Sequence, residues 1–212
     1  MPDFTTPRAG TALLSLPPHI DAAAIVARLI ADGLRVAVIG AEVTGADLIL
    51  PPATDPEAAV HRVEQELGQI SVLITAPGSP PRGRFADCSP SEWLAGVNTA
   101  LFPAFALVRA ATPALTRAGG GRIVLVGTGW SATDLPDATA TAAVQGALIA
   151  LVKTLARDLG PRGITVNEIA LPPGVTSASR ALAAAVGYLT GAHGEAMIGQ
   201  VLTLGSGGEV RP

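Results

Sequence analysis

The chain has 212 residues, of which 49% are hydrophobic and only 15% charged, and its formal net charge is −3. This length suffices for one domain with a substantial core, and the apolar composition argues against a disordered chain. No Lys/Arg-rich run is present, so a nucleic-acid partner is not expected, and the single cysteine, Cys88, excludes a disulfide framework and a thiolate metal site.

Alternating apolar runs and helical patterns predict the elements in chain order. They are a strand at Thr11–Leu16, a helix from Asp21 to Gly33, a strand at Arg35–Ile39, a short outer strand at Leu48–Leu50, a helix from Asp55 to Gly68, a strand at Ser71–Ile74, a helix at Ser91–Thr116, a strand at Arg122–Val126, a helix at Thr139–Leu159, a strand at Thr165–Ile169, a helix at Ser179–Leu189 and a strand at Gln200–Leu204.

This alternation predicts an α/β fold, a doubly wound parallel sheet with helices on both faces, as one domain over residues 1–212. Asp21 and Asp55 are the predicted N-caps of the first two helices. Only Ala41–Ala46 and Asp47 separate Gly40 from the outer strand, which is too few residues for a crossover helix. One helix of the first half is therefore expected to be missing.

No apolar stretch reaches about 18 residues without interruption by Gly, Pro or charge, so no membrane span is expected. Scattered histidines and the lone cysteine provide no clustered ligands, so no metal site is expected either. A cytoplasmic protein is predicted.

The segment Gly121–Gly174, with "GRIVLVGTG" and "LARDLGPRGITVNEIALPPG", closely resembles the short-chain dehydrogenase/reductase family. So do "SVLITAPG" at Ser71–Gly78, "SEWLAGVNTALF" at Ser91–Phe102 and "IGQVLTLGSGG" at Ile198–Gly208. The resemblance implies a Rossmann-like, three-layer α/β/α fold. The short connection after Gly40 then corresponds to a truncated nucleotide-binding half, and the few residues after Gly174 to a reduced substrate lid.

The family binds NAD(P) at a glycine-rich turn after the first strand, where backbone N–H groups meet the pyrophosphate. Here Pro17 and Pro18 lack N–H groups, and Asp21 places a carboxylate where the phosphate would sit. We therefore expect this chain itself to bind no cofactor. The positions of this degenerate turn are Ser15, Leu16, Ile20, Asp21 and Ala22.

The family's reaction uses a Tyr as acid and base with a Lys four residues later. This chain has one Tyr, Tyr188, and one Lys, Lys153, and their spacing excludes such a pair. No functional catalytic residue is expected. The positions that match the family's catalytic residues are Asn98, Thr128, Thr141 and Gln145.

The helix at 139–159 is apolar nearly all round, which indicates burial on more than one side. The resemblance implies that this helix, the helix at 91–116 and the C-terminal strand contact another subunit. The expected function is that of a non-catalytic subunit in a heteromeric complex. The partner is then an intact member of the family, a ketoreductase or hydroxyacyl dehydrogenase, which carries the NAD(P).

Two alternatives remain open. In the first, the chain is a non-redox enzyme, such as a dehydratase, cyclase or isomerase, that uses polar groups in the remnant pocket, which is what is left of the family's active site. In the second, it is a homomeric binding or regulatory protein. The polar groups of that pocket are Thr128, Ser131, Asp134 and Thr139.

Overall fold

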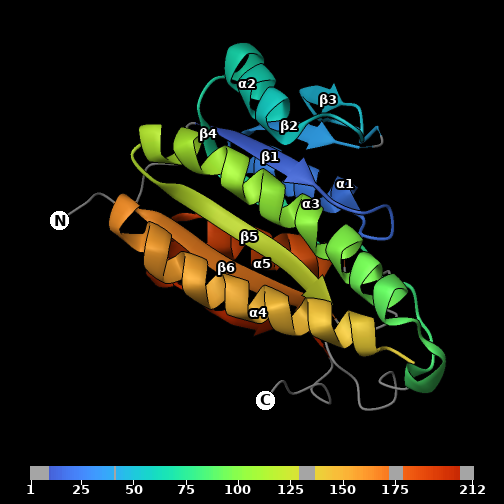
Figure 1. Ribbon diagram of the computed structural model, residues 1–212. Helices are drawn as coiled ribbons and strands as arrows, with labels where there is room; N and C mark the ends of the chain where they lie inside the picture. Colours follow the sequence, from blue (N-terminus) through green and yellow to red (C-terminus); the bar gives the residue numbers. More distant parts are fainter. Residues whose placement is uncertain (1–9, 41, 129–136, 172–178, 206–212) are drawn as a thin grey trace.

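The structure, a computed structural model, describes residues 10–40, 42–128, 137–171 and 179–205. Its centre is a sheet of seven parallel strands in the order β3-β2-β1-β4-β5-β6-β7 (Figure 1). The strands are β1 (Thr11–Ser15), β2 (Arg35–Ile39), β3 (Leu48–Leu50), β4 (Ile70–Thr75), β5 (Gly121–Thr128), β6 (Ile164–Leu171) and β7 (Val201–Thr203). The predicted doubly wound α/β fold is therefore confirmed.

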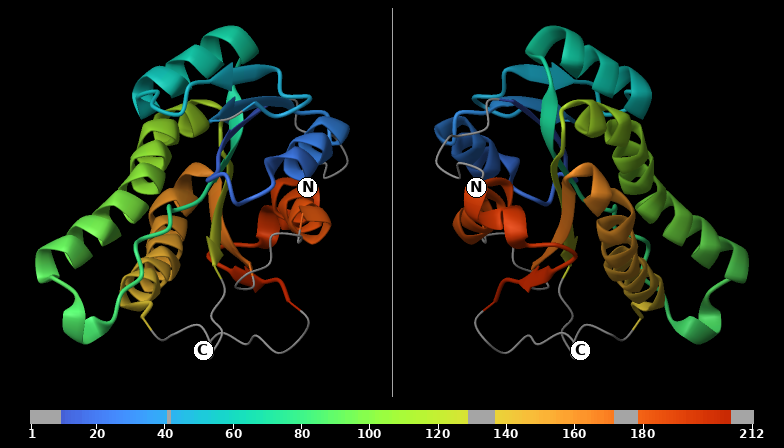
Figure 2. Two further views of the ribbon diagram at one scale, coloured as in Figure 1. Left: turned by 90° about the vertical axis from the view of Figure 1, so that its right-hand side faces the viewer. Right: turned by 90° about the vertical axis from the view of Figure 1, so that its left-hand side faces the viewer.

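Helices cover both faces of the sheet and make three layers (Figure 2). The helices α2 (Pro56–Leu67), α3 (Pro90–Arg117) and α4 (Thr139–Leu159) pack on one face, and α1 (Ala22–Ala31) and α5 (Ser179–Thr190) on the other. Short 3-10 turns lie at Phe85–Asp87, Gly160–Arg162 and Ala192–Ala196. The Val, Leu, Ile and Ala side chains between the layers form two apolar cores, one on each face.

Both predicted aspartate caps are present. The Asp21 carboxylate accepts a hydrogen bond from the Ala23 N–H at 3.0 Å, and the Asp55 carboxylate accepts from the N–H groups of Glu57 and Ala58, also at 3.0 Å. These bonds satisfy N–H groups that a helix leaves unpaired in its first turn. The local sequence therefore sets where α1 and α2 begin.

The connection from β2 to β3 contains no helix in its described residues, as the sequence predicted. Gly40 and Gly45 adopt positive φ angles, which let the chain reverse twice within a few residues. Asp47 then joins the edge of β2: its N–H donates to the Val36 carbonyl at 2.8 Å, and its carboxylate accepts from the Val36 N–H at 2.7 Å. A three-residue β3 can pair in parallel with β2 because this short link returns the chain to the start of β2.

The two long helices, α3 and α4, are apolar and long enough to cross a membrane by length and composition alone. This differs from the expectation that no such stretch exists, because α3 continues through Pro103 and Pro113 without a break. Both helices nevertheless pack against the sheet, as core helices do. Length and composition are therefore weak evidence for a span here.

Candidate functional site

The carboxyl ends of the strands lie together at one edge of the sheet, which is where open α/β sheets bind ligands. The strand order reverses between β1 and β4, and β5 ends nearby at Thr128. The segment 129–136 that follows, with Ser131 and Asp134 of the proposed remnant pocket, lies outside the described residues. The site is therefore built here from the ends of β1 and β5 and from α4.

Two of the positions that match the family's catalytic residues are in direct contact. The side-chain oxygen of Gln145, on α4, accepts a hydrogen bond from the backbone N–H of Thr128 at 3.0 Å. Gln145 is buried, whereas Thr128 and Thr141 are half-buried. Gln145 thus holds the end of β5 through its neutral carboxamide, at the position where the family has a charged ammonium.

Asn98, the fourth matching position, lies on α3 and is exposed. Near it, the N–H of Gly78 donates to the Ala100 carbonyl at 2.8 Å, which ties the loop after β4 to α3. This contact involves backbone only. The structure therefore does not bring the Asn98 side chain into the contact between Thr128 and Gln145.

The single Tyr and the single Lys lie on opposite faces of the sheet. Lys153 is on α4, where its ammonium donates to the Gly199 carbonyl at 2.5 Å. Tyr188 is on α5 and is 45% exposed. The two side chains therefore cannot act together, as their spacing in the sequence predicted.

The turn after β1 does not fit a dinucleotide held in the family's manner. Pro17 and Pro18 supply no N–H groups, and the Pro17 carbonyl accepts the N–H of Ile20 at 2.9 Å. Ile20 is buried in the core beside α1 and α5. The Asp21 carboxylate already occupies the N-terminus of α1, where a phosphate would have to sit. A phosphate at this turn would therefore meet a carboxylate instead of free N–H groups.

Thr139, one of the polar residues assigned to the remnant pocket, is hydrogen-bonded to another side chain. Its hydroxyl accepts a hydrogen bond from the indole N–H of Trp93 at 3.1 Å, which joins the first turns of α3 and α4. A cavity of about 430 Å³ lies beside this contact. Its lining residues are Pro81, Arg82, Gly83, Arg84, Asp87, Cys88, Glu92, Trp93, Asp137, Thr139 and Ala140.

Glu168 is the functional candidate that the sequence analysis missed. It lies on β6 and is fully buried. One of its carboxyl oxygens and the side-chain oxygen of Gln145 both lie close to the point that a β-carbon of Gly127 would occupy. A charged residue within the apolar run "ITVNEIAL" was the signal that could have pointed to it. Among the described residues, no group of three His, Cys, Asp or Glu side chains is placed to hold a metal.

A family model described as Enoyl-(Acyl carrier protein) reductase matches residues 51–210. The match covers the chain from α2 to β7 and leaves out β1, α1, β2 and β3, where the cofactor turn lies. The 3-oxoacyl-(acyl-carrier-protein) reductase of Pseudomonas aeruginosa is 31% identical over 161 residues, which are 75% of this chain and 62% of that protein. The chain therefore matches less than two thirds of this relative.

Solved structures share the fold. The TT0495 protein from Thermus thermophilus aligns with a TM-score of 0.80 at 25% identity, over 93% of this chain and 98% of its own. An enoyl-(acyl-carrier-protein) reductase from Anaplasma phagocytophilum, solved in complex with NAD, aligns with a TM-score of 0.77 at 20% identity, over 91% of each chain.

These comparisons correct three sequence-based predictions. The expected non-catalytic subunit and the expected lack of enzyme activity are contradicted, because the curated relatives are named as reductases. The expectation that this chain binds no cofactor, and that NAD(P) belongs to a partner, is contradicted as well, because the curated relatives are named as reductases, and a reductase needs a reductant. The predictions went wrong because they inferred the function from individual missing side chains.

Proposed function

Because the chain belongs to the short-chain dehydrogenase/reductase family, we propose that it is a cytoplasmic oxidoreductase that reduces the keto group of a 3-oxoacyl thioester. One observation carries this proposal: the family match over residues 51–210 includes β5, α4 and β6, which build the candidate site. The name of the Pseudomonas aeruginosa relative supports the substrate class.

We further propose that the reaction does not use the family's Tyr–Lys pair. Thr141 and Gln145 stand at those positions, and neither a threonine hydroxyl nor a carboxamide has the acidity of a phenol or the charge of an ammonium. Asn98 is exposed and takes no part in the contact between Thr128 and Gln145. The Thr128 hydroxyl is the group that we expect at the substrate carbonyl.

The test is a reductase assay on the purified chain with 3-oxoacyl thioesters of several chain lengths, with NADPH and NADH in separate arms. We expect loss of the reduced nicotinamide with stoichiometric formation of the 3-hydroxyacyl product. Thr128→Val, which keeps the shape and removes the hydroxyl, should lower kcat. Turnover no faster than that of heat-denatured protein, with every substrate and both nucleotides, would overturn the proposal.

We also propose that a second subunit of the same family binds across α3 and α4, with the edge strand β7 contributing. Only 28% of the most apolar 18-residue window of α3, and 33% of that of α4, is buried within the chain. Phe102 and Phe105 on α3 are 64% and 42% exposed, and their ring centroids lie 6.3 Å apart. Paired exposed aromatic rings are typical of surfaces that bind another protein.

A further inference from the structure

Gln145 is a polar side chain in an apolar row of α4. Among the buried residues that the structure describes on this helix, it alone has a polar side chain, and its neighbours in the row are Val144, Leu148 and Val152. Only 5% of Gln145 is exposed. A carboxamide removed from water destabilises the folded protein unless it is hydrogen-bonded, so packing alone would favour an apolar residue here. The hydrogen bond that this carboxamide makes is therefore what distinguishes position 145.

That hydrogen bond fastens the last residue of β5. The pairing of β4 with β5 ends at Leu125, whereas β5 continues beside β6 as far as Thr128. In the described sheet, the end of β5 thus has a neighbouring strand on one side only. The side-chain oxygen of Gln145 reaches it from α4 and accepts the Thr128 N–H at 3.0 Å. Helix α4 therefore holds the backbone where the sheet holds it from one side.

Gly127 provides the space for this contact. A β-carbon at Gly127 would lie 2.9 Å from the side-chain oxygen of Gln145, which is closer than such atoms approach one another in proteins. A side chain at position 127 would therefore push the carboxamide away from its place. The glycine before Thr128 and the glutamine on α4 fit together.

The contact depends on an oxygen at the end of the side chain. The Thr128 N–H is a donor, and the carboxamide of Gln145 accepts it. The ammonium group of a lysine carries three donors and no acceptor. A lysine at position 145, which is the residue that the family carries there, could not make this contact.

We propose that Gln145 is a positioning residue. It acts through the Thr128 N–H to hold the end of β5, and with it the Thr128 hydroxyl, in place for the substrate carbonyl, and lysine cannot substitute for it. Its role in turnover rests on the proposed reductase function. The anchoring of the backbone is a property of the folded chain and can be measured without substrate.

Three variants at position 145 separate the acceptor from the shape of the side chain. Gln145→Met keeps a similar length without an acceptor or a charge, so it should fold. Gln145→Lys supplies donors only, and Gln145→Glu keeps an oxygen acceptor whether or not its carboxyl group is protonated. Asn167→Leu is the matched control, because Asn167 on β6 is also a buried carboxamide, and its oxygen accepts the Gln200 N–H at 2.9 Å.

The first readout is hydrogen exchange of the Thr128 and Gln200 amides. In Gln145→Met and Gln145→Lys we expect the Thr128 amide to exchange about fivefold to tenfold faster, as for the loss of one hydrogen bond, with Gln200 unchanged. Gln145→Glu should match the wild type at Thr128. Asn167→Leu should show the reverse pattern, with faster exchange at Gln200 only. Unchanged Thr128 exchange in Gln145→Met, or equal acceleration of both amides, would overturn the proposal.

The second readout is the kcat and KM of each variant in the reductase assay. Gln145→Met and Gln145→Lys should lower kcat about tenfold with little change in KM, because a misplaced reacting group slows the chemical step more than it weakens binding. Gln145→Glu should lie closer to the wild type than Gln145→Met, and Asn167→Leu should keep the wild-type kcat. A higher kcat in Gln145→Lys than in the wild type would contradict the proposal. If the wild type shows no turnover, the proposed function fails, while the exchange data still decide whether Gln145 anchors Thr128.

Discussion

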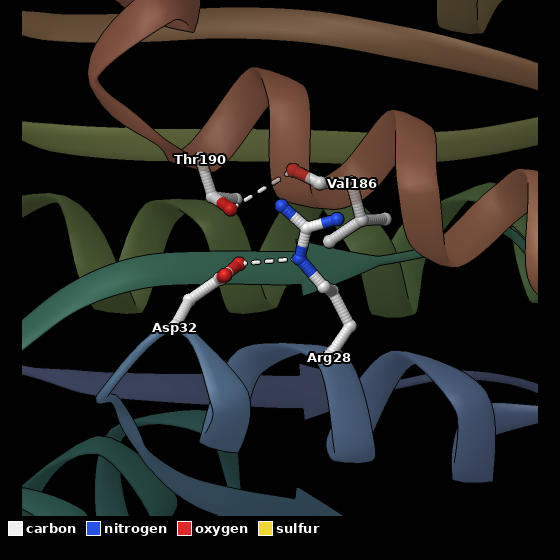
Figure 3. A network of polar contacts seen from close by, with 4 residues as sticks. All are labelled: Arg28, Asp32, Val186 and Thr190. Carbon is white, nitrogen blue, oxygen red and sulfur yellow. Dashed lines mark hydrogen bonds and ion pairs between the residues drawn. The ribbon is translucent and has the colours of Figure 1, made fainter.

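The guanidinium of Arg28, on α1, lies directly against Gly187, on α5, where a β-carbon would overlap it. Figure 3 shows the guanidinium beside the α5 turn between Val186 and Thr190, with its Nε bonded to the Asp32 carboxylate at 2.7 Å. The missing side chain at Gly187 thus sets how closely α1 and α5 approach on their side of the sheet.

A double-mutant cycle tests this contact. Alanine is about 1 kcal/mol more favourable than glycine inside a helix, but at position 187 its methyl group must displace Arg28. We expect Gly187→Ala to change the free energy of unfolding little in the wild type and to raise it by about 1 kcal/mol in the Arg28→Ala background. Urea denaturation measures both, and equal effects in the two backgrounds would show that Arg28 does not need the space.

Gly127 and Gly146 allow a comparison between a glycine with no room for a β-carbon and one with open space around it. Ala at 127 meets Glu168, Gln145 and Leu148 in a buried position, so Gly127→Ala should lower the free energy of unfolding by about 1–3 kcal/mol. Gly146 is exposed on α4 with nothing within 4 Å of a β-carbon, so Gly146→Ala should raise it by up to about 1 kcal/mol. Urea denaturation of both variants measures these changes. An unchanged free energy of unfolding in Gly127→Ala would show that position 127 has room for a methyl group.

The proposed subunit contact predicts that charged residues placed on α3 lower the mass of the assembly in solution. Phe102→Glu combined with Phe105→Glu forces two carboxylates into an apolar interface and should convert a dimer or larger assembly to a monomer with unchanged circular dichroism. Light scattering coupled to size exclusion measures the mass. Ile30→Glu is the control and should leave the assembly intact, because Ile30 lies on α1 at the other face and is 41% exposed, close to the 42% of Phe105. If the wild-type protein itself has the mass of a monomer, the proposed subunit contact is contradicted.

Leu148 must be avoided in that experiment. Leu148 is fully buried in the core, whereas Leu151, on the same helix, is half-buried. We therefore expect Leu148→Glu to unfold the protein, as seen by loss of the cooperative thermal transition. The half-buried residues of α4 with large apolar side chains, which remain available to a partner, are Ile149, Leu151 and Leu155.

The N-terminus of α1 provides a test of nucleotide binding. The Asp21 carboxylate opposes a phosphate there, so Asp21→Ser, which keeps a good N-cap, should tighten the Kd for a nicotinamide dinucleotide about fivefold, or about 1 kcal/mol. Calorimetric titration measures it. Asp55→Ser makes the same change at α2 and should leave the Kd unaltered. An unchanged Kd for Asp21→Ser would mean that the dinucleotide does not meet α1.

The sequence alone was enough to predict the order of strands and helices, because apolar periodicity and local caps depend on near neighbours. Asp21 and Asp55 bond to N–H groups only two or three residues away, and the reversals at Gly40 and Gly45 are equally local. The absence of a Tyr–Lys pair also followed from counting residues. The resemblance to the family was sufficient to predict the fold, but the functional conclusion drawn from the missing motifs was contradicted by the relatives.

Tertiary structure alone decided which distant side chains meet. Gly127, Gln145 and Glu168 come from β5, α4 and β6, and their contact depends on the strand register and on the rotation of α4 about its axis. The same rotation buries Leu148, and the packing of the first turns of α3 and α4 joins Trp93 to Thr139. Periodicity limits the faces of a helix to a few choices, but the side chains of the neighbouring elements select one of them, because only one arrangement fills the space between helix and sheet.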